Sequence, residues 1–200
     1  KNIHCGQGGA LLVNQSEFIS RVEVLLEHGT NRRQFLRGEA DHYSWQDAGS
    51  SFAMSEINAA FLSAQLESLS NVTEDRRGIW HEYHGAFEKF EDRGILRRPI
   101  IPGHCRHNGH CYPLLFPSLE MREQVRKALY TQGVMAHFHY IPLHSSPMGR
   151  RRCSSDPVLP DTEEISRRLL RMPLYIGLDM KDCLARIEAV LQGVFPGGRR

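Results

Sequence analysis

The sequence predicts an α/β fold built in two parts. Residues 111–116, 118–132 and 134–140 alternate between strand, helix and strand patterns, an order typical of layered α/β domains. Two hundred residues are enough for one large domain, or for one domain with part of another. Prolines and glycines shortly before the first of these strands mark a boundary. We therefore predict a small α/β domain at residues 94–200, preceded by part of a larger domain at residues 1–93.

The first part is predicted to be mostly helical. Residues 10–13 form a short apolar run between glycines and an asparagine, which predicts one buried strand. Ser16, Ser55 and Thr73 are candidate helix N-caps, because apolar residues recur at helical spacing after each. Residues 29–53 show no clear period and are predicted to form a long loop with a functional role. The stripe after Thr73 predicts a buried helix face that consists of Ile79, Tyr83, Phe87 and Phe90.

Two further helices are predicted in the second part. Asp161 resembles the start of a capping box and predicts a helix that reaches Arg171. Asp179 opens the last predicted helix. Pro113 falls inside the first predicted strand of this part, so we expect that strand to lie at a sheet edge or to contain a bulge.

Composition excludes several classes of function. The net charge of +2 provides no general attraction to nucleic acid or to a membrane surface. No apolar run approaches the roughly 20 residues of a membrane span, and no signal peptide opens the sequence. The five cysteines are scattered and odd in number, which argues against a disulfide framework. We therefore expect a reducing, cytoplasmic environment.

One cluster has the residue types of a metal site. The stretch His104-Cys105-Arg106-His107-Asn108-Gly109-His110-Cys111 contains histidines and cysteines, the usual ligands of zinc. No second ligand pair follows at zinc-finger spacing. We therefore expect no metal here.

Four segments carry the functional signal through their order and spacing. They are Lys1-Asn2 with Gly6-Gln7-Gly8-Gly9-Ala10, then Gly29-Thr30-Asn31-Arg32, then Asp47-Ala48-Gly49-Ser50-Ser51 with Met54-Ser55 and Ala59-Ala60, and last Phe138-His139-Tyr140-Ile141-Pro142-Leu143-His144. Taken together, they resemble the DegT-type sugar-nucleotide aminotransferases. The resemblance spans nearly the whole chain. It implies the type I, aspartate-aminotransferase-like fold and pyridoxal phosphate (PLP) as the cofactor.

A further segment narrows the resemblance to one branch of this family. This segment looks like the branch that aminates dTDP-4-oxo-6-deoxyglucose to dTDP-4-amino-4,6-dideoxygalactose, and its residues are Arg37-Gly38, Asp41, Tyr43, Trp45, Asp47 and Gly49-Ser50-Ser51. The implied reaction takes an amino group from glutamate and transfers it to C4 of the keto-sugar. The implied product is a building block for a surface polysaccharide or another glycan.

The resemblance implies that Lys1 is the catalytic residue. Its amine would form a Schiff base with PLP and then move a proton between the cofactor carbon and the sugar carbon. Family members are commonly homodimers with shared active sites. Ser51 stands where many of them have an asparagine that reaches the partner's cofactor phosphate. A serine hydroxyl can also donate to a phosphate, so we expect Ser51 to bind the cofactor.

Substrate contacts are expected from two regions of the chain. Arginine suits a diphosphate, and tyrosine can stack or form a hydrogen bond, so the loop after residue 29 is expected to contact the nucleotide sugar. Histidines near residue 140 stand where the family places groups that face the substrate entrance. The expected substrate residues are Asn31, Arg37, Tyr43, His139, Tyr140 and His144.

Three alternatives stay open. Sugar dehydratases of the same fold usually carry histidine in place of the Schiff-base lysine, so Lys1 argues against them. Another is a transaminase for a different keto-sugar nucleotide. The third is a non-catalytic binding module, because the family's ring-stacking aromatic, its pyridine-nitrogen aspartate and other phosphate-binding residues belong upstream of Lys1. We expect an intact protein of roughly twice this length, of which these 200 residues are the C-terminal half and do not catalyse alone.

Overall fold

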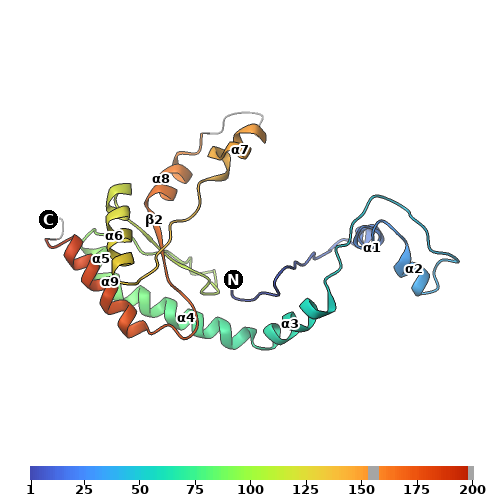
Figure 1. Ribbon diagram of the computed structural model, residues 1–200, viewed down its shortest axis with the longest axis horizontal. Helices are drawn as coiled ribbons and strands as arrows, with labels where there is room; N and C mark the ends of the chain where they lie inside the picture. The colour runs from blue at the N-terminus through green and yellow to red at the C-terminus, as the bar shows by residue number, and fades with distance from the viewer. Residues whose placement is uncertain (153–157, 198–200) are drawn as a thin grey trace. The chain divides into compact units, whose positions relative to one another are not determined.

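The computed structural model describes residues 1–152 and 158–197, and its contacts divide the chain into two compact units (Figure 1). Unit 1 comprises Lys1 and Ile3–Leu69, and unit 2 comprises Asn2 and Ser70–Arg200. Cys153 lies outside the described residues. These units are defined by contacts and divide near residue 69. The domain boundary predicted between residues 93 and 94 stays a prediction.

Unit 1 consists of short helices joined by extended segments. They are the 3-10 helix η1 (Ser16–Phe18) and the α-helices α1 (Ile19–Leu26), α2 (Arg32–Leu36) and α3 (Glu56–Glu67). The predicted cap at Ser55 is confirmed, because its Oγ accepts a hydrogen bond from the Asn58 N–H at 3.3 Å. The predicted cap at Ser16 is wrong, because Ser16 is the first residue of η1 and the preceding Gln15 forms no side-chain cap. α2 lies inside the segment that was predicted to be a loop.

The strand predicted at residues 10–13 is not formed. These residues pair with no strand among the described residues, and Leu11 and Leu12 are 73% and 79% exposed. A β-strand requires a neighbouring strand to satisfy its backbone groups. An apolar run therefore indicates a strand only where a partner lies beside it, and unit 1 offers none to this segment.

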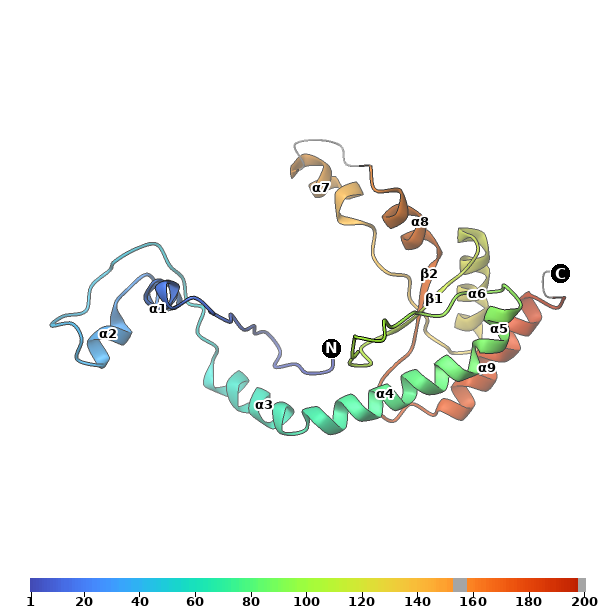
Figure 2. The same cartoon turned by 180° about the vertical axis from the view of Figure 1, so that it is seen from behind.

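Unit 2 contains a two-stranded antiparallel sheet and the remaining helices (Figures 1 and 2). The strands β1 (Tyr112–Leu115) and β2 (Leu169–Met172) pair with Tyr112 opposite Met172. The helices are α4 (Leu69–Ala86), α5 (Glu88–Asp92), α6 (Leu119–Thr131), η2 (Leu143–Ser145), α7 (Pro147–Arg152), α8 (Pro160–Arg168) and α9 (Met180–Val194). α6 packs against α9. No helix within the described ranges is long and apolar enough to cross a membrane.

The core of unit 2 confirms the predicted stripe on α4 and α5. All four residues of the stripe are buried. The Tyr83 ring stacks on Phe87 with ring centroids 5.5 Å apart and on Tyr112 of β1 with centroids 5.2 Å apart. The Tyr83 hydroxyl donates to the Pro173 carbonyl oxygen at 2.8 Å. Aromatic packing therefore joins α4 to the sheet, and one hydrogen bond completes the junction.

Two helix boundaries in unit 2 differ from the prediction. α4 begins at Leu69, before the predicted cap at Thr73. The helix predicted to reach Arg171 ends at Arg168, and β2 follows directly. Buried and partly buried side chains alternate along β2, the period of a strand, but four residues beside an amphipathic helix are too few to reveal that period in the sequence.

One predicted strand of unit 2 is reduced to a single bridge. Residues 134–140 form no strand, and only His137 pairs with Arg171 of β2, with backbone hydrogen bonds of 3.0 and 2.7 Å. The other predicted strand is confirmed as β1, and the helix between them is confirmed as α6, with the Ser118 side chain as its N-cap. The last helix, α9, begins as predicted after Asp179, whose carboxylate accepts from the Asp182 N–H.

Substituting Gly109 tests a close backbone approach in unit 2. Gly109 has a φ of +62°, and a Cβ there would lie 2.7 Å from the carbonyl carbon of Arg76. We expect Gly109→Ala to cost about 1–3 kcal/mol and to lower the Tm by several degrees. Gly103→Ala, where nothing lies within 4 Å of the added Cβ, is the matched control and should leave the Tm unchanged. A Gly109→Ala protein as stable as the wild type would contradict the described approach.

Candidate active site

Two glycines bring the second and third motif segments together within unit 1. A Cβ on Gly29 would overlap the Asp47 carbonyl oxygen, and a Cβ on Gly49 would overlap the Gly29 backbone nitrogen. Gly29 also has a φ of +79°, in the left-handed region that favours glycine. Both positions therefore require glycine, and their contact makes residues 29–32 and 47–51 neighbours.

Backbone hydrogen bonds complete this junction. The Gln46 N–H donates to the Gly29 carbonyl oxygen at 2.7 Å, and the His28 N–H donates to the Ser50 carbonyl oxygen at 3.2 Å. Ser51 forms an isolated antiparallel bridge with Glu27 at the end of α1. The side chains of Arg21 and Asp47 form an ion pair across the same junction. Ser51 is thus placed by its neighbours, although its own side chain is exposed.

The segment that carries Lys1 approaches the residues around the start of α3. A Cβ on Gly8 would lie 2.6 Å from the Met54 side chain. Asn58 of α3 donates its side-chain N–H to the Gln7 carbonyl oxygen at 3.3 Å. The first and third motifs, far apart in the sequence, therefore meet in unit 1.

Lys1 itself is exposed, and none of the ion pairs among the described residues involves it. An accessible primary amine can condense with an aldehyde once it is deprotonated. The structure thus presents the amine that the predicted role of Lys1 requires. The catalytic role itself stays a prediction.

Asn31 uses its side-chain amide within unit 1. It is only 8% exposed. Its Oδ1 accepts from the Ser44 N–H at 2.8 Å, and its Nδ2 donates to the His42 carbonyl oxygen at 3.2 Å. These bonds hold residues 42–44 against the start of α2. They give Asn31 a structural function that sequence reasoning missed, because residues this far apart leave no local pattern; its predicted substrate contact is untested.

Arg37 lies in a network of carboxylates. Its guanidinium donates to both oxygens of Glu23 at 2.9 Å and to Glu39 at 2.8 and 2.9 Å. These hydrogen bonds lower the pKa of both carboxyl groups. Tyr43 is 56% exposed. In this structure a diphosphate would have to compete with two carboxylates for Arg37, whereas Tyr43 is accessible.

The three predicted site residues of unit 2 lie on and near η2. His139 is partly buried, and burial together with the positive charge of Arg171 lowers its pKa. Tyr140 is 81% exposed. His144 Nε2 lies 3.0 Å from Glu163 Oε1. Glu163 belongs to α8, and no spacing in the sequence indicated that it would position His144.

The histidine and cysteine cluster at 104–111 does not converge on one point. Within residues 1–152 and 158–197, no group of three or more histidine, cysteine or acidic side chains is placed to hold a metal ion. The His107 ring instead packs on Trp80, with ring centroids 4.3 Å apart. Cys105 is exposed and Cys111 partly buried, and both are free thiols.

Comparison with solved structures defines the fold class. The sugar aminotransferase CalS13 from Micromonospora echinospora matches with a TM-score of 0.79 at 16% identity, and the alignment covers 96% of this chain and 49% of that chain. The fold is the type I fold of PLP-dependent transferases.

The sequence comparison defines the family. The chain belongs to the DegT/DnrJ/EryC1/StrS aminotransferase family, whose model matches residues 1–191. Aminotransferases of this family depend on PLP.

Two curated relatives show how far the similarity extends. The dTDP-4-dehydro-2,3,6-trideoxy-D-glucose 4-aminotransferase of Saccharopolyspora spinosa is 28% identical over 180 residues, which are 87% of this chain and 45% of the relative. The spore coat polysaccharide biosynthesis protein SpsC of Bacillus subtilis is 27% identical over 200 residues, which are 95% of this chain and 50% of the relative. The chain therefore spans about half the length of these relatives.

Replacing Asn31 tests its structural function. In Asn31→Asp, a carboxylate can no longer donate to the His42 carbonyl oxygen, so we expect residues 32–44 to open more often. Loss of one buried hydrogen bond should make limited proteolysis of this segment about tenfold faster. Asn14→Asp, at an exposed position, is the control for the change in charge. Equal cleavage of wild type and Asn31→Asp would show that the bonds of Asn31 do not hold the segment.

Proposed function

We propose that the full-length protein is a cytoplasmic, PLP-dependent aminotransferase for a nucleotide-linked keto-sugar. It would transfer the amino group of glutamate to C4 of a dTDP-4-oxo-6-deoxy sugar, giving a dTDP-4-amino-4,6-dideoxy sugar for a surface polysaccharide or another glycan. The observation that carries this proposal is that the Lys1 segment lies against the third motif, through Gly8 beside Met54 and the Gln7 carbonyl oxygen bonded to Asn58. Family membership supplies the reaction class.

The described residues fit PLP in the chemistry of their side chains. An aldehyde needs an accessible amine, which Lys1 offers, and a phosphate needs donors, of which the exposed Ser51 hydroxyl is one. When bound, PLP supplies the electron sink that lets an amino group pass from donor to acceptor. Lys1 attaches the cofactor and afterwards carries the proton that the reaction moves.

Ser51 is proposed to donate to the cofactor phosphate of a partner subunit. The backbone bridge to Glu27 and the glycine contacts beside it hold residues 49–51 without using the Ser51 hydroxyl for the junction. A side chain on a rigid segment binds a ligand without first paying an ordering cost. The proposed assembly is a homodimer in which each active site includes residues of both subunits.

The proposed substrate contacts come from two stretches of the chain, residues 31–43 and residues 139–144. Arg37 and Tyr43 would contact the diphosphate and the nucleotide, and Arg37 would exchange a carboxylate for a phosphate to do so. His144, with Glu163 beside one ring nitrogen, and Tyr140 would bind sugar hydroxyls. Asn31 would shape the loop that contains Arg37 and Tyr43, because it bonds residues 42–44, in addition to the predicted contact with substrate. The S. spinosa relative is named for a reaction on a dTDP-4-keto sugar, which supports this substrate class.

We also propose that these 200 residues alone do not catalyse. The matched relatives are about twice as long. In unit 1, apolar side chains of residues 11, 12, 52 and 57 are 68–83% exposed. Exposed apolar surface of this kind is usually covered in a complete domain. By themselves, the residues would therefore form a non-catalytic module of the same fold.

Replacing Lys1 in the full-length protein tests the proposed function. Lys1→Ala removes both the attachment of the cofactor and the proton carrier, so we expect amino transfer to fall by at least about 10³-fold. The Tm without cofactor should be little changed, because the Lys1 side chain forms no hydrogen bond or ion pair with the described residues. Lys127→Ala, at an exposed position on α6, is the control and should keep full activity. Full activity in Lys1→Ala would remove Lys1 from the mechanism.

Replacing Ser51 tests the phosphate contact separately. Ser51→Ala should weaken cofactor retention by about 10- to 150-fold, the range expected for one hydrogen bond to a charged group. Ser50→Ala changes the neighbouring serine, whose backbone rather than side chain forms the junction, and should retain the cofactor normally. Equilibrium dialysis against PLP measures both. Wild-type retention in Ser51→Ala would exclude the contact.

A further inference from the structure

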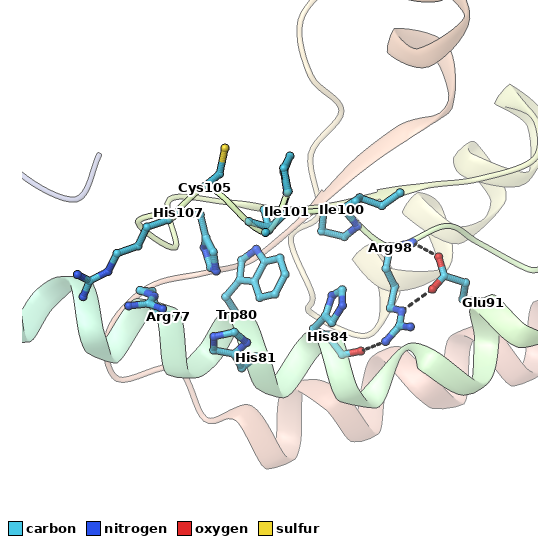
Figure 3. Close-up of a pocket in the computed structure, with 14 residues that line it drawn as sticks. Arg77, Trp80, His81, His84, Glu91, Arg98, Ile100, Ile101, Cys105 and His107 are labelled. Atoms are coloured by element: carbon cyan, nitrogen blue, oxygen red, sulfur yellow. Dashed lines mark hydrogen bonds and ion pairs between the residues drawn. The ribbon is translucent and has the colours of Figure 1, made fainter.

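A pocket of about 530 Å³ lies within unit 2, between α4 and the loop that precedes β1 (Figure 3). Figure 3 shows that Arg77, Trp80, His81 and His84 project from α4, and that His107 approaches Trp80 from the loop. This volume falls in the range of small-molecule sites. The mechanism proposed above uses none of these residues.

Trp80 forms the rigid base of the pocket. It is only 4% exposed. The His84 ring stacks on it with ring centroids 4.6 Å apart, and the His107 ring lies 4.3 Å away on a tilted plane. His84 Nδ1 also shares a hydrogen bond with the Tyr112 hydroxyl at 3.2 Å. The aromatic base is therefore held by the core and needs no ligand to order it.

His107 presents a hydrogen-bond donor at the pocket. The Gly109 N–H donates to His107 Nδ1 at 3.2 Å, so Nδ1 is the acceptor nitrogen of the neutral ring. The proton of neutral His107 must then lie on Nε2. Burial and the positive charge of Arg77 lower the pKa of His107, which favours this neutral form. His107 thus offers an N–H without carrying a charge of its own.

One arginine at the pocket is paired with a carboxylate, and the other two are not. Arg98 is paired with Glu91 at 2.6 Å and donates to the His84 carbonyl oxygen at 2.6 Å. Arg77 and Arg106 form no ion pair in the part of the chain that the structure describes. The Arg77 Nε is buried and has no hydrogen-bond partner there. The guanidinium groups of Arg77 and Arg106 therefore carry positive charge that no carboxylate of the described residues pairs, as a site for an anion requires.

We propose that this pocket binds a small anion that carries a phosphate or carboxylate group beside a flat apolar group. The anionic group would accept from the guanidinium groups of Arg77 and Arg106 and from the Nε2–H of His107. The flat group would lie along the apolar loop wall, which includes Ile100 and Pro102. Three arginines and one glutamate line the pocket, so its charge favours an anion over a cation.

The test measures binding of phenyl phosphate to the full-length, cofactor-loaded protein by titration calorimetry. Loading the protein with cofactor occupies the binding site of the cofactor phosphate, so phenyl phosphate cannot bind there. Arg77→Gln and Arg106→Gln each remove one charged donor, and each should weaken binding about tenfold or more. Arg106 is exposed, so its variant should fold normally even if Arg77→Gln does not. Arg150→Gln, on the exposed side of α7, removes the same charge elsewhere and should bind as the wild type does.

Inorganic phosphate tests the contribution of the anionic group alone, and phenol tests that of the flat apolar group alone. Both should bind more weakly than phenyl phosphate, because each lacks one of the two groups that the pocket contacts. Binding at any other anion site would persist unchanged in the Arg77 and Arg106 variants. The proposal is overturned if phenyl phosphate does not bind, if Arg106→Gln binds it as tightly as Arg150→Gln, or if inorganic phosphate binds equally well.

Discussion

The Tyr83 side chain is fully buried where α4, β1 and α9 meet, and a hydroxyl in that position must find a partner. It donates to the Pro173 carbonyl oxygen just after β2 and contacts the Cys183 Sγ of α9 at 3.3 Å. Burial raises the pKa of Tyr83, so the hydroxyl stays neutral and available as a donor. This one residue ties helix, sheet and C-terminal helix together. The same packing fixes the rotation of α4 and thereby places Trp80, His81 and His84 together at the pocket.

Unit 1 depends on a different constraint, which is the close approach of backbones at glycine. Gly29 and Gly49 let two motif segments touch, and Gly8 lets the Lys1 segment approach Met54. No large apolar core holds these segments, because no apolar side chain of unit 1 is fully buried. The glycines of the family motifs therefore act on the site indirectly. They let the segments that contain Lys1 and Ser51 pack against their neighbours at distances that a side chain at these glycines would prevent.

The sequence predicted those features that depend on interactions between residues near one another in the chain. The Ser55 cap and the apolar stripe from Ile79 to Phe90, which spans α4 and α5, depend on residues close together in the sequence, and both are confirmed. Pairing between distant segments was not accessible in the same way. The apolar run at 10–13 resembles a strand but has no partner in unit 1. In contrast, β2 is a short segment directly after a helix, and only its pairing with β1 identifies it as a strand. Similarly, the bonds of Asn31 to residues 42–44 join groups that no sequence period connects.

The central claim is that Lys1 is the residue to which the cofactor attaches. The most direct measurement is to load the full-length protein with PLP, reduce it with borohydride and map the modified residue by peptide mass spectrometry. We expect a pyridoxyl group on Lys1 at near-stoichiometric yield. A pyridoxyl group on another lysine, or an unmodified Lys1 in cofactor-saturated protein, would contradict it and would favour a binding-only member of the same fold.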